Sequence, residues 1–466
     1  MNQAISVAPL DVVVLAAGKG TRMRSAHPKV LQPLGGEPML AHVLRAVVAL
    51  MLQQVHLVVG HGQAEVREWA ASQGDMTGPV TWVEQTEQLG TGHAVRLSAK
   101  AWTPGSVVLV AYGDVPLITP ATLASAAEAA RSQVVIITAK VAEPSGYGRI
   151  VRDASGQVSA IVEHADATPA QQAIKEINTG VIAAPADWLG PWLDALQNDN
   201  PKGEYYLTDV IAMAVVEGRP VTGLCAADAA ELEGVNDRVQ LAKAERQLQS
   251  RRATALMRAG VTLADPARLD VRGGVQAGQD VSIDVGCILE GRVVLGNKVR
   301  IGPYCHLRDV ELGDGAVIES HSVLEGVVTA AHVHVGPFAR LRPGTRLATG
   351  AKVGNFVETK KAIVGAGSKI NHLSYVGDAE LGADVNVGAG TITCNYDGAN
   401  KHLTRIGDRA FIGSNSALVA PVEIGADATI GAGSVIAKPA PAGQLTVSRS
   451  KQISLPGWQR PTPRKA

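Results

Sequence analysis

The sequence predicts two domains of different fold class: an N-terminal α/β domain with a Rossmann-like, mostly parallel sheet, and a C-terminal parallel β-helix of hexapeptide repeats, joined by a long helix. Three observations support this. Apolar strands alternate with amphipathic helical stretches over the first ~225 residues, residues 237–259 contain neither Gly nor Pro, and aliphatic-Gly pairs recur in steps of six from about residue 280. A chain of 466 residues is too long for one ordinary core.

The α/β domain is predicted from its apolar runs. Runs of strand length lie at residues 11–17, 56–59, 106–110 and 133–137, and helical stretches lie near residues 38–52, 92–101 and 120–132. Such alternation favours an open, mostly parallel sheet covered by helices. We therefore expect an α/β domain over residues 1–235, a linker helix over 236–260, and a β-helix with a C-terminal tail over 261–466.

The six-residue repeat fits neither a helix nor an alternating strand, but it fits a coil of three short strands per turn. One aliphatic side chain per strand points inward, and the following Gly lets the backbone turn the corner. Two stretches break the period, one around residues 340–344 and one at 393–401, and we expect both to form loops at a binding face. The pairs that define the repeat include Leu295-Gly296, Ile301-Gly302, Leu381-Gly382, Val387-Gly388, Ile406-Gly407, Ile412-Gly413, Ile424-Gly425 and Ile430-Gly431.

Composition excludes several classes of protein. The formal net charge is zero, so neither nucleic-acid binding nor a polybasic membrane surface is predicted. No basic leader precedes the first apolar run and no apolar run approaches ~18 residues, so we expect no signal peptide and no membrane helix. Four cysteines without a CxxC pair suit a reducing compartment, and we expect a cytoplasmic protein.

A glycine-rich turn after the first strand is the first candidate site. Gly18 and Gly20 let backbone amides approach a phosphate, and Lys19, Arg22 and Lys29 can neutralise its charge. The turn matches neither a P-loop nor a dinucleotide fingerprint. A tight turn without a ligand is the alternative, but the surrounding cations favour phosphate binding.

Two oxygen-bearing residues are candidate metal ligands. Asp114 follows an apolar strand in a Gly-Asp turn, where a ligand for Mg²⁺ is expected. Asn236 directly precedes the long helix, and from the sequence alone an N-cap is the favoured interpretation of it.

In the repeat region, His372 is the candidate base. Histidine titrates near neutral pH and suits proton removal from an amine, although a lone histidine is more often a structural or surface residue. Arg342, Lys360 and the Asn395-Tyr396 loop accompany it in the sequence. Two cations suit one phosphate, and solvated surface charges are the alternative for each.

These motifs resemble a known enzyme family. Residues 15–23 with Pro28-Lys29 are similar to the signature of sugar-nucleotide pyrophosphorylases. The segments 85–92, 112–114, 146–149, 178–180 and 233–236, together with Glu163, narrow the resemblance to the bacterial bifunctional N-acetylglucosamine-1-phosphate uridyltransferases and glucosamine-1-phosphate N-acetyltransferases. The resemblance runs from about residue 11 to about residue 458.

The resemblance implies the roles of the N-terminal residues. Arg22 and Lys29 would be catalytic and stabilise charge on the triphosphate, and Asp114 and Asn236 would hold Mg²⁺. UTP and the uridine-diphosphate sugar would be bound by Leu15, Ala16, Ala17, Gly18, Lys29, Gln85, Gly90, Thr91, Tyr112, Gly113, Asp114, Gly148, Glu163, Asn178 and Asn236, of which Gly148, Glu163 and Asn178 hold the sugar.

For the C-terminal domain the resemblance implies a left-handed β-helix, a homotrimer, and acetyl transfer from acetyl-CoA. His372 would accept the proton of the sugar amine. Glucosamine-1-phosphate would contact Arg342, Lys360, Tyr375 and Asn386, and acetyl-CoA would contact Ala389, Asn395, Tyr396, Ser414, Ala432 and Arg449.

The implied reaction order is acetylation of glucosamine-1-phosphate and then uridyl transfer, giving UDP-N-acetylglucosamine for cell-wall and lipopolysaccharide synthesis. Two alternatives remain at this point. One is a single-activity pyrophosphorylase whose β-helix serves oligomerisation or allosteric control, and the other is a non-catalytic hexapeptide scaffold. His372 with Asn395-Tyr396 argues against the first, and the cations Arg22, Lys29, Arg342 and Lys360 argue against the second.

Overall fold

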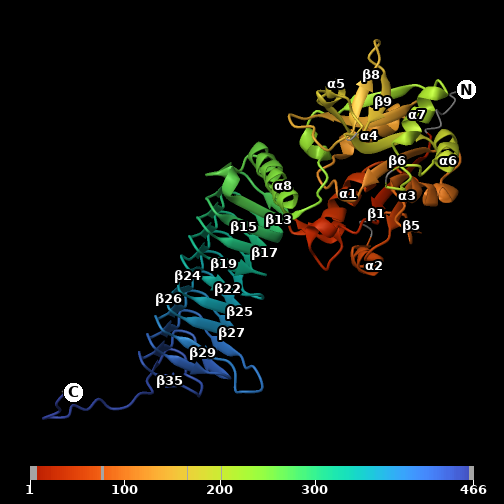
Figure 1. Cartoon of the computed structure of the whole chain (residues 1–466). Helices are drawn as coiled ribbons and strands as arrows, with labels where there is room; N and C mark the ends of the chain where they lie inside the picture. The colour runs from red at the N-terminus through yellow and green to blue at the C-terminus, as the bar shows by residue number, and fades with distance from the viewer. Residues whose placement is uncertain (1–7, 75–77, 165, 201, 461–466) are drawn as a thin grey trace, which may run out of the picture. The chain divides into compact units, whose positions relative to one another are not determined.

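The computed structural model describes residues 8–74, 78–164, 166–200 and 202–460. The chain divides into two compact units, Met1–Leu248 and Gln249–Ala466 (Figure 1). The boundary falls inside the long helix α8 (Arg238–Arg258), which occupies the Gly- and Pro-free stretch of the sequence. The last six residues of the basic tail lie outside the described part of the chain.

The first unit is built on one sheet with the order β11-β7-β10-β6-β1-β4-β5, and β8 and β9 pair beside β10. Strands β1, β4, β5 and β6 run parallel to one another, as do β7 and β11, whereas β10 is antiparallel to both of its neighbours. The mostly parallel sheet is therefore confirmed. Its strands are β1 (Leu10–Ala16), β4 (Gln54–Val59), β5 (Val80–Glu84), β6 (Val107–Tyr112), β7 (Val134–Lys140), β8 (Arg149–Arg152), β9 (Val158–Val162), β10 (Glu176–Pro185) and β11 (Val221–Cys225); β2 (Pro33–Leu34) and β3 (Glu37–Pro38) form a separate hairpin.

Helices cover both faces of this sheet, because its strands are apolar on both sides. One face packs on side chains of α1, α2 and α4, and the other on side chains of α3, α6 and α7. The predicted helices near 38–52, 92–101 and 120–132 correspond to α1, α3 and α4. The helices are α1 (Met39–Val48), α2 (Gln63–Ser72), α3 (Thr91–Ser98), α4 (Pro120–Ala129), α5 (Pro169–Gln172), α6 (Ala186–Ala195) and α7 (Asp209–Val216).

The second unit is a parallel β-helix with three strand positions per coil, as the six-residue period predicts (Figure 1). Its core is one continuous column of small aliphatic side chains. The first position holds β12 (Thr262–Leu263), β14 (Ser282–Ile283), β16 (Arg300–Ile301), β18 (Val317–Ile318), β21 (His334–Val335), β24 (Lys352–Asn355), β26 (Lys369–His372), β28 (Asn386–Val387), β31 (Phe411–Ile412), β34 (Thr429–Ile430) and β36 (Leu445–Thr446).

The other two positions are partly fused into long strands that bend at a corner, and all of them pair in parallel. Strands that span both positions are β13 (Leu269–Ala277), β15 (Cys287–Leu295), β17 (His306–Leu312), β25 (Glu358–Val364) and β27 (Tyr375–Leu381). The shorter strands are β19 (Val323–Glu325), β20 (Val328–Thr329), β22 (Arg340–Leu341), β23 (Arg346–Leu347), β29 (Ile392–Cys394), β30 (Thr404–Ile406), β32 (Ala417–Val419), β33 (Val422–Ile424) and β35 (Val435–Ile436).

Only one of the two predicted interruptions breaks the coil. Val335 pairs with Val353, a step of 18 residues like that from Ile283 to Ile301, so the stretch 340–344 lies in a coil of ordinary length. The prediction of a loop there is wrong, because Arg340-Leu341 forms β22 and the following turn is an ordinary corner. Val387 pairs with Ile412, a step of 25 residues, so the loop at 393–401 is a real insertion.

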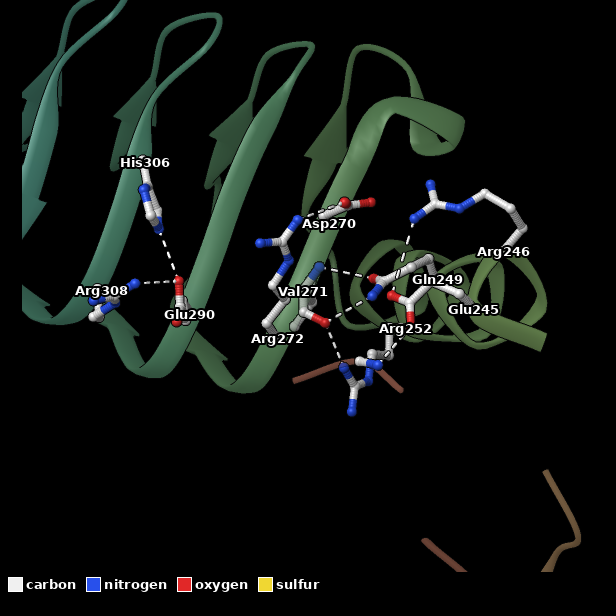
Figure 2. A network of polar contacts seen from close by, with 11 residues as sticks. Glu245, Arg246, Gln249, Arg252, Asp270, Val271, Arg272, Glu290, His306 and Arg308 are labelled. Atoms are coloured by element: carbon white, nitrogen blue, oxygen red, sulfur yellow. Dashed lines mark hydrogen bonds and ion pairs between the residues drawn. The ribbon is translucent and has the colours of Figure 1, made fainter. Parts of the chain in front are cut away.

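The C-terminal part of α8 covers the first coil of the β-helix. Gln249 is buried, donates to the Val271 carbonyl at 2.9 Å and accepts from the Val271 amide at 2.7 Å. Figure 2 shows Gln249 and Arg252 both directed at Val271 from α8. The end strand of the solenoid therefore has these backbone groups paired instead of presenting them as an open edge.

Candidate functional site

A pocket of about 240 Å³ lies at the carboxyl ends of β1 and β6. Ligands of parallel α/β sheets bind at this edge, because the loops that follow the strands meet there. Ten of the predicted nucleotide-site residues line it: Leu15, Ala16, Ala17, Gly18, Lys29, Gln85, Gly90, Thr91, Tyr112 and Asp114. Sequence segments that are far apart are thus brought to one cavity.

Backbone contacts hold these loops together. The Gly113 amide donates to the Leu15 carbonyl at 2.9 Å, and the Gln88 side-chain amide donates to the Ala17 carbonyl at 2.8 Å. Gly90 has a φ of 103°, and a Cβ there would lie 2.6 Å from the Tyr205 carbonyl oxygen. Glycine is therefore required at this position for the close approach of the two loops.

Lys29, Asp114 and Asn236 converge at the mouth of the pocket. The Lys29 ammonium forms an ion pair with the Asp114 carboxylate and donates to Asn236 Oδ1 at 3.2 Å. Both partners of the ion pair are largely buried, with side-chain exposures of 12% and 18%. The two predicted metal ligands therefore direct their oxygens at one point, although they are 122 residues apart in sequence.

This donor set fits Mg²⁺. A carboxylate and an amide oxygen are hard ligands, and Mg²⁺ is commonly held by one or two such protein groups while phosphates and water supply the rest. Within the described ranges no cluster of three or more His, Cys, Asp or Glu side chains could hold a metal without such help.

The structure tests the N-cap interpretation of Asn236. Helix α8 is capped by Asp237, whose carboxylate accepts from the Val239 and Gln240 amides, each at 2.9 Å. The Asn236 side chain instead faces Lys29. The N-cap interpretation is therefore wrong for Asn236, and its neighbour fulfils that role.

Tyr112 lies between this site and β10. Burial raises the pKa of the Tyr112 hydroxyl, and the negative charge of Asp114 raises it further. A Cβ on Gly180 would lie 2.9 Å from the Tyr112 ring, so the ring packs directly on the β10 backbone. Tyr112 therefore stays neutral and can only exchange hydrogen bonds with a ligand.

The predicted sugar residues form a group of their own, in which Gly148 directly precedes β8, Glu163 directly follows β9 and Asn178 lies in β10. The backbone N–H of Asn178 donates to the Gly148 carbonyl at 2.8 Å, and a Cβ on Gly148 would lie 3.3 Å from Glu163 Oε1. Glu163 lines a separate cavity of about 390 Å³. Arg22 is exposed and does not line the nucleotide pocket.

Four lining residues of the nucleotide pocket were not predicted: Val30, Gln88, Ala94 and Glu204. Gln88 lies inside the motif at residues 85–92 and could have been included on that ground. Glu204 follows no motif that we recognised, and only the fold brings it to the pocket.

In the β-helix, His372 belongs to a column of residues at one corner of successive coils, which we call the His372 column: Asn355, His372, Ala389, Ser414 and Ala432. His372 is exposed, and its Nδ1 lies 2.7 Å from Asn355 Oδ1. The Arg449 guanidinium reaches the Ala432 carbonyl at 2.9 Å. Four of the predicted acetyl-CoA residues thus lie on the same corner as the predicted base.

A second corner carries what we call the charged column, in which opposite charges alternate: Arg272, Glu290, Arg308, Glu325, Arg342 and Lys360. Figure 2 shows its first coils, where His306 and Arg308 both contact Glu290. The alternation ends at Lys360, whose neighbour in the column is the cation Arg342.

Lys401, which was not predicted, adds a third positive charge. A contact with Lys401 and its charge lower the pKa of the Lys360 ammonium, Arg342 adds to this, and Asp378 opposes it. Lys401 ends the inserted loop, whose Asn395 donates to Asp378. The only sequence signal for Lys401 was its place in the insertion.

A single chain therefore presents the predicted acetyltransferase residues as two halves. His372 is the last residue of β26. Lys360 instead pairs with Gly377, which lies in the following strand β27. Tyr375 begins β27 and Asn386 begins β28, so neither residue belongs to the His372 column or to the charged column. No hydrogen bond or ion pair joins the His372 column to Arg342 or Lys360 in the part of the chain that the structure describes.

Comparison with known proteins defines the class of each unit. Residues 12–189 match the MobA-like NTP transferase domain, and residues 292–326 and 403–438 match the bacterial transferase hexapeptide family of six repeats. The chain thus combines a nucleotidyltransferase domain with a hexapeptide transferase domain.

Relatives over the full length narrow the class further. The bifunctional protein GlmU of Alkalilimnicola ehrlichii is 58% identical over 461 residues, covering 99% of this chain and 97% of that protein. Those of Marinobacter nauticus and Chromobacterium violaceum are 54% and 53% identical and cover 98% and 97% of this chain. The chain belongs to the GlmU family of bifunctional proteins.

This membership confirms the predicted enzyme class. The chain is a bifunctional transferase that acetylates glucosamine-1-phosphate and then transfers a uridyl group to make UDP-N-acetylglucosamine. In the described ranges, no helix combines the length and the apolar character that crossing a membrane requires.

Proposed function

We propose that the 240 Å³ pocket binds UTP and performs the uridyl transfer. A phosphate oxygen of N-acetylglucosamine-1-phosphate attacks the α-phosphorus of UTP, and the bond to the β-phosphate breaks to release pyrophosphate. Such reactions require positioning and charge neutralisation more than covalent chemistry from the protein. The observation that carries the proposal is the convergence of Asp114 and Asn236 on Lys29 at the mouth of this pocket.

Each polar group has a role in this proposal. Asp114 and Asn236 would hold Mg²⁺, which neutralises the phosphate oxygens when bound. Lys29 moves from its ion pair to the triphosphate, and Arg22 reaches the phosphates from the exposed turn. Gln85, Gly90 and Thr91 orient the base, and Gly148, Glu163 and Asn178 hold the sugar.

We further propose that His372 is the base of the acetyl transfer. The amine of glucosamine-1-phosphate attacks the thioester carbon of acetyl-CoA, the carbon–sulfur bond breaks, and His372 accepts the amine proton. An Asn355 Oδ1 that accepts from Nδ1–H keeps Nε2 free to take this proton. Ala389, Ser414, Ala432 and Arg449 line the acetyl-CoA side, and Arg342 and Lys360 bind the sugar phosphate with Lys401.

The two halves of this site support a homotrimer in which each site is shared between copies. Lys360, Lys401, Asn395 and Tyr396 of one copy then complete the His372 column of the next. Closed rings of identical subunits produce such heterologous interfaces. Tyr375 and Asn386 contribute to the sugar from the intervening strands.

A cytoplasmic location accompanies this proposal. The four cysteines are free thiols within the described ranges, which suits a reducing compartment, and both nucleotide-containing substrates, UTP and acetyl-CoA, are cytoplasmic metabolites.

Mixing two inactive variants tests the shared site. His372→Ala and Lys360→Ala proteins are each expected to lose acetyl transfer, and subunit exchange between them is expected to restore about one quarter of the wild-type sites, since random assembly pairs two intact halves about one time in four. The assay follows release of the coenzyme A thiol from acetyl-CoA and glucosamine-1-phosphate. No recovery after verified exchange means that each site lies within one chain. Absence of both activities from the wild-type protein would contradict the proposed function itself.

A further inference from the structure

The orientation of the Gln85 side chain is fixed by two contacts. Its Nε2 donates to the Gly90 carbonyl at 3.1 Å and lies 3.3 Å from His93 Nδ1. A carbonyl can only accept, so the atom beside Gly90 has to be the amide nitrogen and not the amide oxygen. Gln85 is 5% exposed, so this arrangement is held inside the protein.

The amide oxygen of Gln85 is left for a ligand. Oε1 has no hydrogen-bond partner among the described residues. It is also not one of the fully buried side-chain atoms that lack a partner, so it remains accessible. Gln85 lines the nucleotide pocket, so Oε1 opens into it. Both hydrogens of Nε2 are used, and the group presented to the pocket is therefore an acceptor alone.

His93 can support this orientation only while its ring is neutral. It lies in the first turn of α3, and its Nδ1 faces an amide nitrogen that can only donate, so Nδ1 has to carry the lone pair. Burial lowers the pKa of His93 below the ordinary value of 6.5, and the positive charge of Arg96 lowers it further, whereas Glu87 raises it. The third neighbour is the Tyr205 ring, with centroids 6.3 Å apart, and Arg96 stacks on it at 4.7 Å.

We propose that His93 is a specificity-determining positioning residue, which accepts a hydrogen bond from Gln85 Nε2 and thereby presents Gln85 Oε1 to the N–H edge of the nucleotide base. This inference rests on the proposed binding of UTP in this pocket. His93 does not touch the reacting phosphates, and it acts through Gln85.

The chemistry of the bases identifies what this acceptor selects. In a uridine nucleotide N3–H is the only donor of the ring, since N1 is bonded to ribose, and O2 and O4 accept. Cytosine has a lone pair at N3, which would oppose Oε1. A site whose polar groups are fixed in one direction rejects a base with the opposite pattern, because buried groups are then left unpaired.

Two substitutions separate the hydrogen bond from the shape of the ring. His93→Phe keeps a flat ring without an acceptor, and His93→Asn places an amide oxygen near the position of Nδ1. We expect His93→Phe to raise the KM for UTP about 5- to 10-fold and to lower the UTP-to-CTP ratio of kcat/KM by about 10-fold. The kcat of His93→Phe and its KM for the sugar phosphate should change less than about twofold. His93→Asn should restore most of the affinity for UTP and most of the UTP-to-CTP preference.

A pH series gives a readout that a purely structural role would not move. A protonated His93 cannot accept from Nε2, so the KM for UTP should rise as pH falls below the ordinary histidine value. His93→Asn should lack this rise while sharing every other titration, including that of UTP. Arg96→Met should move the rise to higher pH, since it removes a charge that lowers the pKa of His93.

A double-mutant cycle with Gln85→Ala completes the test. If His93 acts through Gln85, His93→Phe should have little effect on nucleotide preference when Gln85 is already absent. The proposal is overturned if folded His93→Phe keeps the wild-type UTP-to-CTP ratio of kcat/KM. It is also overturned if His93→Phe lowers this ratio equally with and without the Gln85 side chain. Should His93→Phe fail to fold, equal pH profiles for the wild type and His93→Asn overturn it. Failure of the proposed function is distinct, since the wild-type protein would then show no UTP-dependent transfer.

Discussion

In the N-terminal unit the charge of Lys29 is neutralised within the chain, because its ammonium forms an ion pair with the Asp114 carboxylate. In the β-helix the charged column alternates over its first five members and then ends on Lys360, with the cation Lys401 beside it. The pocket lysine of the first site is thus paired within the chain, whereas the second site keeps an excess of positive charge at one corner.

The two folds explain this difference. A parallel sheet gathers its loops at one edge, so residues from distant segments meet in a cavity of one chain. A β-helix has flat faces and stacks equivalent positions above one another, so its residues form columns on separate corners. The shared site that we propose for the β-helix follows from this separation of its columns.

The largest expected effect tests whether the two sites are independent. Asp114→Ala should lower uridyl transfer on the order of 10³-fold or more, because it removes the carboxylate that we propose as a ligand for Mg²⁺ at the phosphates. Acetyl transfer should be unchanged. Pyrophosphate release and coenzyme A release measure the two activities on the same sample. Asp194→Ala, at an exposed position of α6, is the control, and loss of both activities in Asp114→Ala would contradict the assignment.

The converse change is His372→Ala. Removal of a general base should lower acetyl transfer about 10²- to 10⁴-fold and leave uridyl transfer from N-acetylglucosamine-1-phosphate intact. Asn355→Ala should have a smaller effect on the same step, since it only orients the ring. Acetyl transfer at the normal rate in His372→Ala would remove this residue from the mechanism.

A third change concerns the excess charge at Lys360. Lys401→Ala should raise the KM for glucosamine-1-phosphate about 5- to 10-fold at neutral pH, because one of three cations facing the phosphate is lost. It should also raise the pKa of Lys360, whose protonated form is the one proposed to bind the phosphate. The alkaline rise in KM should then begin at a higher pH in Lys401→Ala than in the wild type. Identical alkaline profiles would show that Lys401 does not act on Lys360.

The smallest effect concerns the cap of the β-helix. Gln249→Ala leaves the buried Val271 amide without its partner, at a cost of about 1–3 kcal/mol, whereas the Val271 carbonyl still accepts from Arg252. Thermal unfolding of the β-helix should shift to lower temperature, and uridyl transfer measured below that temperature should be normal. Gln279→Ala, at an exposed position of the same unit, serves as the control. A shift no larger than that of the control would show that α8 does not stabilise the first coil.

Periodicity explains which parts of the fold could be predicted. The strands of the first unit, the helices α1, α3 and α4, and the three-strand coil follow from apolar spacing, which reports local geometry directly. The false interruption at 340–344 shows the limit of this signal. Arg and Pro there resemble an insertion in composition, but only the pairing of Val335 with Val353 measures the length of the coil.

The sequence by itself determined the two fold classes and the family, because strand and helix periods and short motifs are properties of neighbouring residues. Only the tertiary structure decided that Asn236 faces Lys29 while Asp237 caps α8, that Lys401 lies beside Lys360, and that His93 lies beside the Gln85 amide. It also separated the His372 column from the charged column. These facts depend on which side chains meet across loops and coils, and such contacts are set by the register of distant strands, which no local pattern encodes.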